Sequence, residues 1–210
     1  MEIDFTQITA YQRYKLMASL IVPRPIALVT TLGPTGVANA APFSMFNMLG
    51  EDPPILMLSI NRQHGGRMKD TAANILATGE FVVHLCDEPM AAQMHACGEA
   101  LPSDVSELAH VGFHALPSQT VKPPRIAEAP VAFECVLHEK LETESRYVFI
   151  GRVQWLCARE GLVDIETWRV RLQDYHPVGR FGASFYVTTR DRFAIAGPDE
   201  EARRTPIDEI

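Results

Sequence analysis

The sequence predicts a mainly β, antiparallel barrel with helices inserted between some of its strands. Strand-length segments mostly follow one another directly along the chain, and only a few are separated by helical stretches. A doubly wound parallel sheet would instead need a helix after nearly every strand. Neither an internal repeat nor a long linker divides the 210 residues. We therefore expect a single domain over 1–210, with its core between about residues 10 and 190.

The first half of the chain consists of short elements separated by proline and glycine breaks. The expected elements are a helix over 11–20, strands over 26–31, 37–46 and 55–61, and a helix over 71–77. Pro23 and Pro25 end the first helix, because proline cannot continue a helix and restricts the residue before it. A glycine-bearing turn at 33–36 joins the first two strands into a hairpin. Asp70 is the expected N-cap of the second helix, and Gly79 is its expected C-terminal stop.

Two long neighbouring strands dominate the second half. The expected elements are a strand over 81–86, helices over 89–96 and 105–109, a loop at 122–125, and strands over 131–142 and 147–158. Phe133 and Cys135 alternate with Glu134, which is typical of a strand with one buried face. A glycine-rich segment follows at 178–185, and we expect the charged tail at 198–210 to be mobile.

Composition and charge narrow the classes of function. Hydrophobic residues make up 47% of the chain, which is enough for one sizeable core, and the formal net charge is -7. A mildly acidic chain without a basic tract lacks the electrostatic footprint for nucleic acid or for anionic lipid. The N-terminus lacks a basic segment followed by an apolar run, and no apolar stretch is long enough to span a bilayer. We expect a cytoplasmic protein that binds neither nucleic acid nor membrane.

Motifs for metal, thiol or nucleotide chemistry are weak or missing. Four cysteines are scattered along the chain: Cys86, Cys97, Cys135 and Cys157. They form no CxxC, so we expect them to be reduced and mostly buried. The sequence lacks GxGxxG, GxxxxGK[ST], GxSxG and HExxH. His110 and His114 are four residues apart, but Gly112 separates them, and two solvent-facing histidines at a helix end explain them better than a metal site.

A candidate phosphate site lies between the third strand and the second helix. The stretch offers two glycines, a hydroxyl and several cations: Gly65, Gly66, Thr71, Arg62, Arg67 and Lys69. A helix start adds free N–H groups and the positive end of the helix dipole. An ordinary capped helix after a solvated loop shares these features and is the commoner case. These residues alone therefore do not establish a site.

A second candidate stretch is the predicted hairpin over 23–46. Its strands carry hydroxyls and an amide among small alanines: Thr30, Thr31, Asn39 and Ser44. Small residues leave room for a flat ring against a strand, and the polar side chains can bind the edge of that ring. A half-buried hairpin whose polar residues face water explains the pattern equally well.

Taken in order, the segments of this chain resemble those of the flavin reductase-like, FMN-binding split-barrel family. The matching segments are PRPIALVTT, NAAPFSMF, DPPILMLSI, KDTAANI, EAPVAFECVLHEKLE, a GRV within a strand, and PVGRFGASFY. They run from about Pro23 to Tyr186, which is nearly the whole predicted core. The resemblance, which extends to flavoredoxin, implies an antiparallel split β-barrel with inserted helices that binds FMN and forms a homodimer.

In proteins similar to this one, FMN lies at a dimer interface with its phosphate near the KDT segment. The resemblance therefore implies phosphate contacts from Lys69 and Thr71, with Asp70 capping the helix and Ser59 or Arg62 assisting. It also implies ring and ribityl contacts from the polar residues of the hairpin: Thr30, Thr31, Asn39 and Ser44. Redox chemistry would belong to the flavin itself, so we assign no catalytic residue.

The resemblance implies an NAD(P)H:flavin reductase-like oxidoreductase, with NADH or NADPH as electron donor. Many family members that use NADH carry a Gly-Asp-His-like element before the GRV strand, and the segment 141–147 has no such histidine. His138 and His176 are weaker candidates for a place near the ring. Arg180 either matches a family position near the flavin or is a surface arginine beside a glycine turn. Two alternatives remain: a flavoredoxin-like electron-transfer flavoprotein reduced by a redox protein partner, and a flavin-binding module without turnover.

Overall fold

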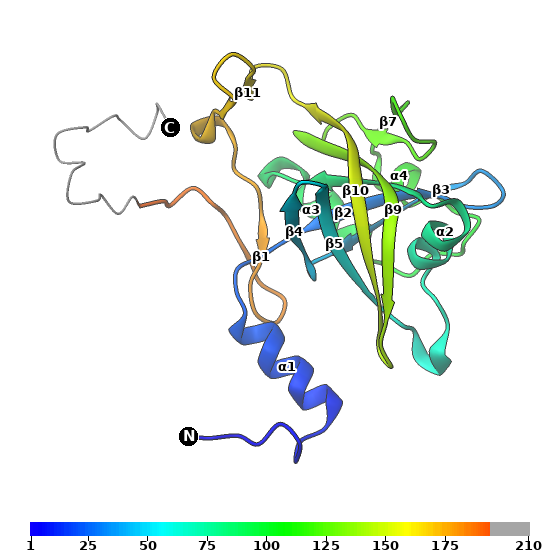
Figure 1. Cartoon of the computed structure of the whole chain (residues 1–210), viewed down its shortest axis with the longest axis vertical. Helices are drawn as coiled ribbons and strands as arrows, with labels where there is room; N and C mark the ends of the chain where they lie inside the picture. Colours follow the sequence, from blue (N-terminus) through cyan, green and yellow to red (C-terminus); the bar gives the residue numbers. More distant parts are fainter. Residues whose placement is uncertain (194–210) are drawn as a thin grey trace.

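The structure, a computed structural model, describes residues 1–193 and centres on one antiparallel sheet (Figure 1). Its strands are β2 (Ala27–Leu32), β3 (Ala38–Phe43), β4 (Phe46–Glu51), β5 (Pro54–Asn61), β6 (Glu80–Leu85), β9 (Val131–Glu142) and β10 (Arg146–Ala158). They follow the order β3-β2-β6-β9-β10-β5-β4. Within the described chain, the end strands β3 and β4 do not pair with each other, so the barrel is open between them. The predicted mainly β, antiparallel fold is confirmed.

Helices and short strands surround this sheet. The α-helices are α1 (Ala10–Leu20), α2 (Asp70–Thr78), α3 (Ala91–Ala96) and α4 (Glu107–Val111), and the 3-10 turns are η1 (His64–Gly66), η2 (Glu88–Met90) and η3 (Leu172–Asp174). The short strands are β1 (Arg24–Pro25), β7 (Ala115–Leu116), β8 (Arg125–Ile126), β11 (Val163–Asp164), β12 (Arg169–Val170), β13 (Gly179–Arg180) and β14 (Tyr186–Val187). Within residues 1–193, no helix is both long and apolar enough to cross a bilayer.

Most predicted elements are present, and two predictions are wrong. The strand expected over 37–46 ends at Phe43, and the chain bends at Ser44 and Met45 before β4, which was not predicted and forms a hairpin with β5. Asp70 is not an N-cap, because α2 begins with it and Lys69 has the extended backbone of the cap position. An acidic residue in the first turn still interacts favourably with the helix dipole. Predictions for the tail at 198–210 fall on residues outside the described range.

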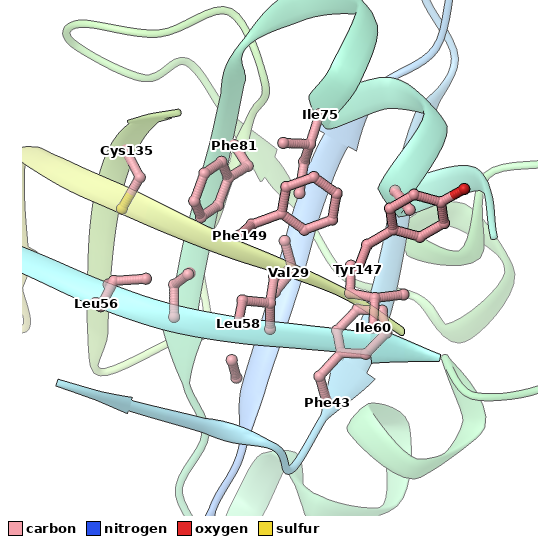
Figure 2. Close-up of a cluster of buried hydrophobic side chains, with 13 residues drawn as sticks. Val29, Phe43, Leu56, Leu58, Ile60, Ile75, Phe81, Cys135, Tyr147 and Phe149 are labelled. Carbon is pink, nitrogen blue, oxygen red and sulfur yellow. The ribbon is translucent and has the colours of Figure 1, made fainter. Parts of the chain in front are cut away.

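The main core fills the space between the strands and α2. Its members are Ala27, Val29, Phe43, Leu56, Leu58, Ile60, Ala72, Ile75, Phe81, Val83, Cys135, Tyr147 and Phe149 (Figure 2). Gly151 faces the ring of Phe81 so closely that a side-chain carbon would clash with it, which explains the glycine of the GRV segment. Tyr147 and Phe149 stack with their ring centroids 6.2 Å apart. These buried apolar side chains fix the positions of the strand ends that border the candidate site.

At Glu134 the outer face of β9 is covered by another segment of the chain. Glu134 is fully buried, because the loop before β8 folds over it and donates backbone N–H groups to its carboxylate. An alternating pattern predicts a solvated face only where no other segment packs on that face. Here the burial of Glu134 is matched by hydrogen bonds, as a buried charge requires.

α1 extends away from the sheet and has no buried residue (Figure 1). A capping box fixes its start: the Thr9 hydroxyl accepts from the Gln12 backbone N–H, and the Gln12 side chain accepts from the Thr9 backbone N–H. The apolar residues that predicted the helix remain exposed: Tyr11, Tyr14, Met17 and Leu20. This helix therefore contributes a surface rather than core packing.

Because His84 is fully buried, we expect the folded protein to lose stability in mild acid. His84 donates from Nδ1 to the Leu28 carbonyl oxygen at 3.0 Å, and its Nε2 accepts from the Ile126 N–H at 3.0 Å. The ring is neutral in this arrangement, and burial lowers its pKa from 6.5 to about 4, an effect that the Leu28 hydrogen bond only partly opposes. The unfolded chain binds this proton at higher pH, so the free energy of unfolding should fall by about 3 kcal/mol between pH 6.5 and 4.

Urea denaturation at a series of pH values measures this effect. The variant His84→Phe, whose side chain does not titrate, should show a flatter pH dependence between pH 6.5 and 5. Identical slopes for the two proteins in that window would contradict the assignment. Acidic groups with lowered pKa, such as Glu134, contribute only below about pH 4.5 and do not obscure the comparison.

Candidate functional site

A buried polar cluster forms where β2 and β3 meet the first turn of α2. The Asn39 amide nitrogen donates to the Thr71 hydroxyl at 3.0 Å and lies 3.4 Å from the Thr31 hydroxyl. The Asn74 amide donates to the same Thr31 hydroxyl at 3.0 Å. Thr31, Thr71 and Asn74 are buried, and Asn39 is partly exposed. Three of the residues predicted for binding are thus brought together at the start of a helix.

Two cations lie beside this cluster without an acidic partner. Lys69 is half-buried, and its ammonium group lies 5.7 Å from the centre of the Phe43 ring. Burial lowers the pKa of Lys69, and the charge of Arg146 lowers it further. Among the ion pairs of the described residues, none includes Lys69 or Arg146. Two neighbouring cations without a carboxylate favour an anion between them.

The remaining predicted residues of the helix approach are placed differently. Arg62 forms an ion pair with Glu142 at 3.0 Å, and its guanidinium lies 4.0 Å from the Tyr147 ring centre and donates to the Tyr147 hydroxyl. Ser59 is buried, and its carbonyl oxygen accepts from Arg146 at 3.4 Å. The charge of Arg62 is therefore already paired, whereas Ser59 lies next to an unpaired cation.

Thr30 lies apart from the polar cluster. Its hydroxyl donates to the Pro124 carbonyl oxygen at 2.6 Å, and its side chain is fully buried. Neighbouring residues of a strand point to opposite faces, so Thr30 and Thr31 cannot both face the start of α2. The structure brings Thr31, and not Thr30, to the candidate site.

Ser44 and Arg180 lie at a separate cavity of about 600 Å³ next to the bend between β3 and β4. The cavity is lined by segments of α1, β1, the end of β3, α3 and the 180–186 hairpin. Arg180 stands opposite Arg24 in the β1–β13 pair. Phe43 lines this cavity and also contacts Lys69, so the cavity and the polar cluster share a wall.

Sequence reasoning missed several residues of the site. Asn74 lies three residues after Thr71, so helical spacing could have revealed it. Arg146 and Arg24 carry no such signal, because strand pairing brings them to the site from distant parts of the chain. Glu107 of α4 accepts from the Ala40 N–H at 2.9 Å and so anchors β3 from the side.

The histidines and cysteines that the sequence singled out lie outside this arrangement. His114 is exposed and bonds Glu128 at 2.6 Å, and His110 is exposed on α4, as expected for solvent-facing residues. His138 is exposed on β9, and His176 bonds Arg192 at 3.1 Å. The cysteines are unpaired, and Cys86, Cys97 and Cys135 are buried. Burial raises the pKa of Cys97 to about 12, so this thiol is inert at neutral pH.

Comparison with known proteins identifies a family. Residues 17–169 match the flavin reductase like domain. A protein of Aquifex aeolicus is 38% identical over 174 residues, covering 83% of this chain and 88% of its own. The protein YwrF of Bacillus subtilis is 37% identical over 198 residues, covering 91% of this chain and 96% of its own. Neither relative is characterised.

Solved structures agree in fold over almost the whole chain. The 2-nitrobenzoate 2-nitroreductase NbaA of Pseudomonas fluorescens is 39% identical with a TM-score of 0.86, covering 95% of this chain and 97% of its own. Component B of nitrilotriacetate monooxygenase from Bacillus cereus is 31% identical with a TM-score of 0.87, covering 93% and 98%. Flavoredoxin of Desulfovibrio vulgaris shares the fold at 19% identity and a TM-score of 0.73, covering 95% and 99%. The chain belongs to the flavin reductase-like family of split-barrel proteins and is an oxidoreductase-type enzyme of that family.

Proposed function

We propose that this protein is an FMN-dependent oxidoreductase, an NAD(P)H:flavin reductase-like flavoprotein. The observation that carries the proposal is a pair of cations beside the polar start of α2, Lys69 and Arg146, which form no ion pair within residues 1–193. A phosphate group fits this donor set, since it needs charge, a hydroxyl and the free N–H groups of a helix start together. Riboflavin alone would leave both cations without a partner.

Each residue then has a role in binding. Lys69, Arg146 and Thr71 hold the phosphate, with the carbonyl of Ser59 fixing the Arg146 side chain. Asn39 and Thr31 form the polar wall behind the sugar-alcohol chain. Ser44, at the open bend after β3, lies where the edge of the ring would be bound. When bound, FMN supplies the transfer of hydride and electrons, and the chain supplies binding, orientation and shielding from water.

We also propose that the protein acts as a homodimer. Large apolar side chains are exposed on the edge strand β4, where Met48 is 64% and Leu49 is 51% exposed, and on β10, at Trp155 and Leu156. Large apolar side chains exposed on an edge strand are candidates for burial against another chain. A second copy could bury them and extend the open side of the barrel, where β3 and β4 end the strand order.

One feature favours a second candidate, a flavoredoxin-like electron-transfer protein reduced by a redox protein. The turn between β9 and β10 spans 143–145 and is closed by the Arg146 N–H, which donates to the Thr143 hydroxyl at 3.0 Å. This turn holds no histidine, whereas many NADH-dependent proteins that this chain resembles carry one at this position. Electron delivery by a protein would not need that histidine.

An anaerobic titration distinguishes the two candidates. The purified protein should be yellow, and NADH or NADPH should bleach the visible absorbance of the bound flavin on the timescale of turnover. Bleaching by a reduced ferredoxin but by neither nucleotide would support the electron-transfer candidate instead. A protein that neither contains nor takes up FMN would contradict the proposed function altogether.

A further inference from the structure

The cavity beside Ser44 carries an excess of positive charge. Three cationic side chains line it, Lys15, Arg24 and Arg180, against a single carboxylate, Glu99. Glu99 forms no ion pair with them among those of the described residues. A concave site with this balance of charge attracts anions.

The two arginines are held together by the backbone. Arg24 and Arg180 are direct partners in the antiparallel β1–β13 pair, so their side chains start side by side on the two strands. Burial is the main cause that lowers the pKa of Arg24, and the charge of Arg180 acts in the same direction. Arg180 donates to the Ala183 carbonyl oxygen at 2.7 Å and lies 4.8 Å from the Tyr186 ring centre. Neither arginine has a carboxylate partner in the described chain.

Hydrogen bonds hold Arg24 in place, but they do not use all of its guanidinium nitrogens. Its Nη1 donates to the carbonyl oxygens of Ala18 and Ile21 in the last turn of α1, the latter at 2.7 Å. Only 9% of the residue is exposed, and within residues 1–193 its Nε has no hydrogen-bond partner. A buried guanidinium nitrogen without a partner is unfavourable and indicates a missing acceptor. The residue lines the cavity, so its guanidinium is the buried cation that an anion bound there would meet.

Aromatic side chains form much of the rest of the wall. They come from α1, β3 and β14: Tyr11, Tyr14, Phe43 and Tyr186. Tyr186 is fixed by a hydrogen bond of 2.8 Å between its hydroxyl and Nδ1 of His95, with the two rings edge to face. Flat apolar faces next to arginine forks suit a ligand that joins an aromatic ring to an anionic group.

We propose that this cavity binds the flavin's reaction partner and selects an aromatic anion, with Arg24 and Arg180 holding its anionic group. The inference rests on the proposed function, because it takes Ser44 and Phe43 as the boundary between the flavin ring and the cavity. A carboxylate on an aromatic ring is the smallest ligand with this chemistry. The pyrophosphate and adenine of a nicotinamide dinucleotide share the chemistry, so the test separates the two sources.

Isothermal titration of the FMN-loaded protein tests the inference without turnover. The probes are benzoate, its neutral isostere benzamide, acetate, which lacks the ring, and ADP. Benzoate should bind at least about tenfold more tightly than benzamide or acetate, because only benzoate uses both the arginines and the aromatic wall. Tight binding of ADP with weak binding of benzoate would identify the dinucleotide as the source of the anion and still support the site. Equal, weak binding of all four probes would overturn it.

Variants connect the preference to the arginines. Arg180→Gln should reduce the affinity for benzoate by about tenfold and leave the affinity for benzamide unchanged. Arg24→Lys, which keeps the charge near α1, should reduce the affinity for benzoate by a smaller factor. Arg152→Gln, at an exposed arginine of β10, is the matched control and should change neither. Unchanged benzoate binding in a folded Arg180→Gln protein would overturn the proposal. Loss of FMN from the Arg180→Gln protein would place Arg180 in the flavin site and would also overturn the proposal. Failure of the parent protein to take up FMN would contradict the proposed function and not this inference.

Discussion

Replacing Lys69 by alanine should raise the dissociation constant for FMN by about ten- to a hundredfold. A hydrogen bond to a charged group contributes about 1.5 to 3 kcal/mol, and each 1.4 kcal/mol corresponds to a factor of ten. Lys69 is half-buried beside Arg146, where screening by water is reduced and its attraction to a dianion is strengthened. Riboflavin, which lacks the phosphate, should bind to the variant within about twofold of its affinity for the parent protein. Fluorescence quenching of both flavins on titration measures the two constants.

The double variant Lys69→Ala with Thr71→Ala should increase the difference between the loss of affinity for FMN and the loss of affinity for riboflavin. Thr71→Ser, which keeps the hydroxyl, should behave like the parent protein. Lys122→Ala removes an exposed lysine from the loop over β9, so it controls for the loss of one positive charge. An equal loss of affinity for FMN and riboflavin in the Lys69 variant would show that the phosphate is bound elsewhere.

The sequence predicted the sheet because its signals are local. Strand-length apolar runs, adjacent in the chain and separated by proline or glycine, are sufficient to indicate antiparallel neighbours. The β3–β4 bend was missed because Ser44 and Met45 look like strand residues, and only the pairing of β4 with β5 shows that a new strand begins. The two-residue strands β1 and β13 were missed because so short a pairing has no periodicity.

The site was predictable only in part, for a related reason. Lys69 and Thr71 are close in sequence and stand at a helix start, so a local pattern is enough to propose them. Asn39 comes from another hairpin, whose polar pattern a half-buried surface explained equally well. Only the resemblance to a family favoured Asn39 as a binding residue before the structure placed it 3.0 Å from Thr71. The positions of Arg24 and Arg146 at the site depend on how strands from distant parts of the chain pair with each other. Register is set by long-range packing, which one sequence read alone does not reveal.

A second large effect is expected at the buried carboxylate of β9. Glu134 accepts from the Gln119 N–H at 2.8 Å and from the Thr120 N–H at 2.6 Å, and Arg125 lies 3.6 Å away. Gln119 and Thr120 belong to the loop that packs over β9, and Arg125 begins β8 directly after it. Pro124 of the same loop accepts a hydrogen bond from the Thr30 hydroxyl. One side chain thus accepts two backbone N–H groups of the loop and pairs with the arginine that follows it.

Glu134→Ala should lower the free energy of unfolding by about 3 to 5 kcal/mol, because it leaves the N–H groups of Gln119 and Thr120 without their acceptor and removes the carboxylate paired with Arg125. Burial alone would raise the pKa of Glu134, but the hydrogen bonds from Gln119 and Thr120 and the charge of Arg125 outweigh it, and the pKa is lowered. A lowered pKa means that the ionised group stabilises the fold above the unfolded value near 4.5 and that this stability is lost as the pH falls through the folded pKa. The difference between the parent protein and the variant should therefore be largest near pH 7 and shrink below about pH 4.5.

Urea denaturation of the parent protein, Glu134→Ala and Glu139→Ala measures both parts of this expectation. Glu139 lies on the same strand but is exposed, so its removal should change the free energy of unfolding by less than about 0.5 kcal/mol. If Glu134→Ala cost no more than Glu139→Ala at pH 7, the loop would be held by its apolar contacts and not by the carboxylate. If the cost were large but independent of pH down to 3, the group would be buried in its protonated form, and the hydrogen bonds from Gln119 and Thr120 would not stabilise a charge.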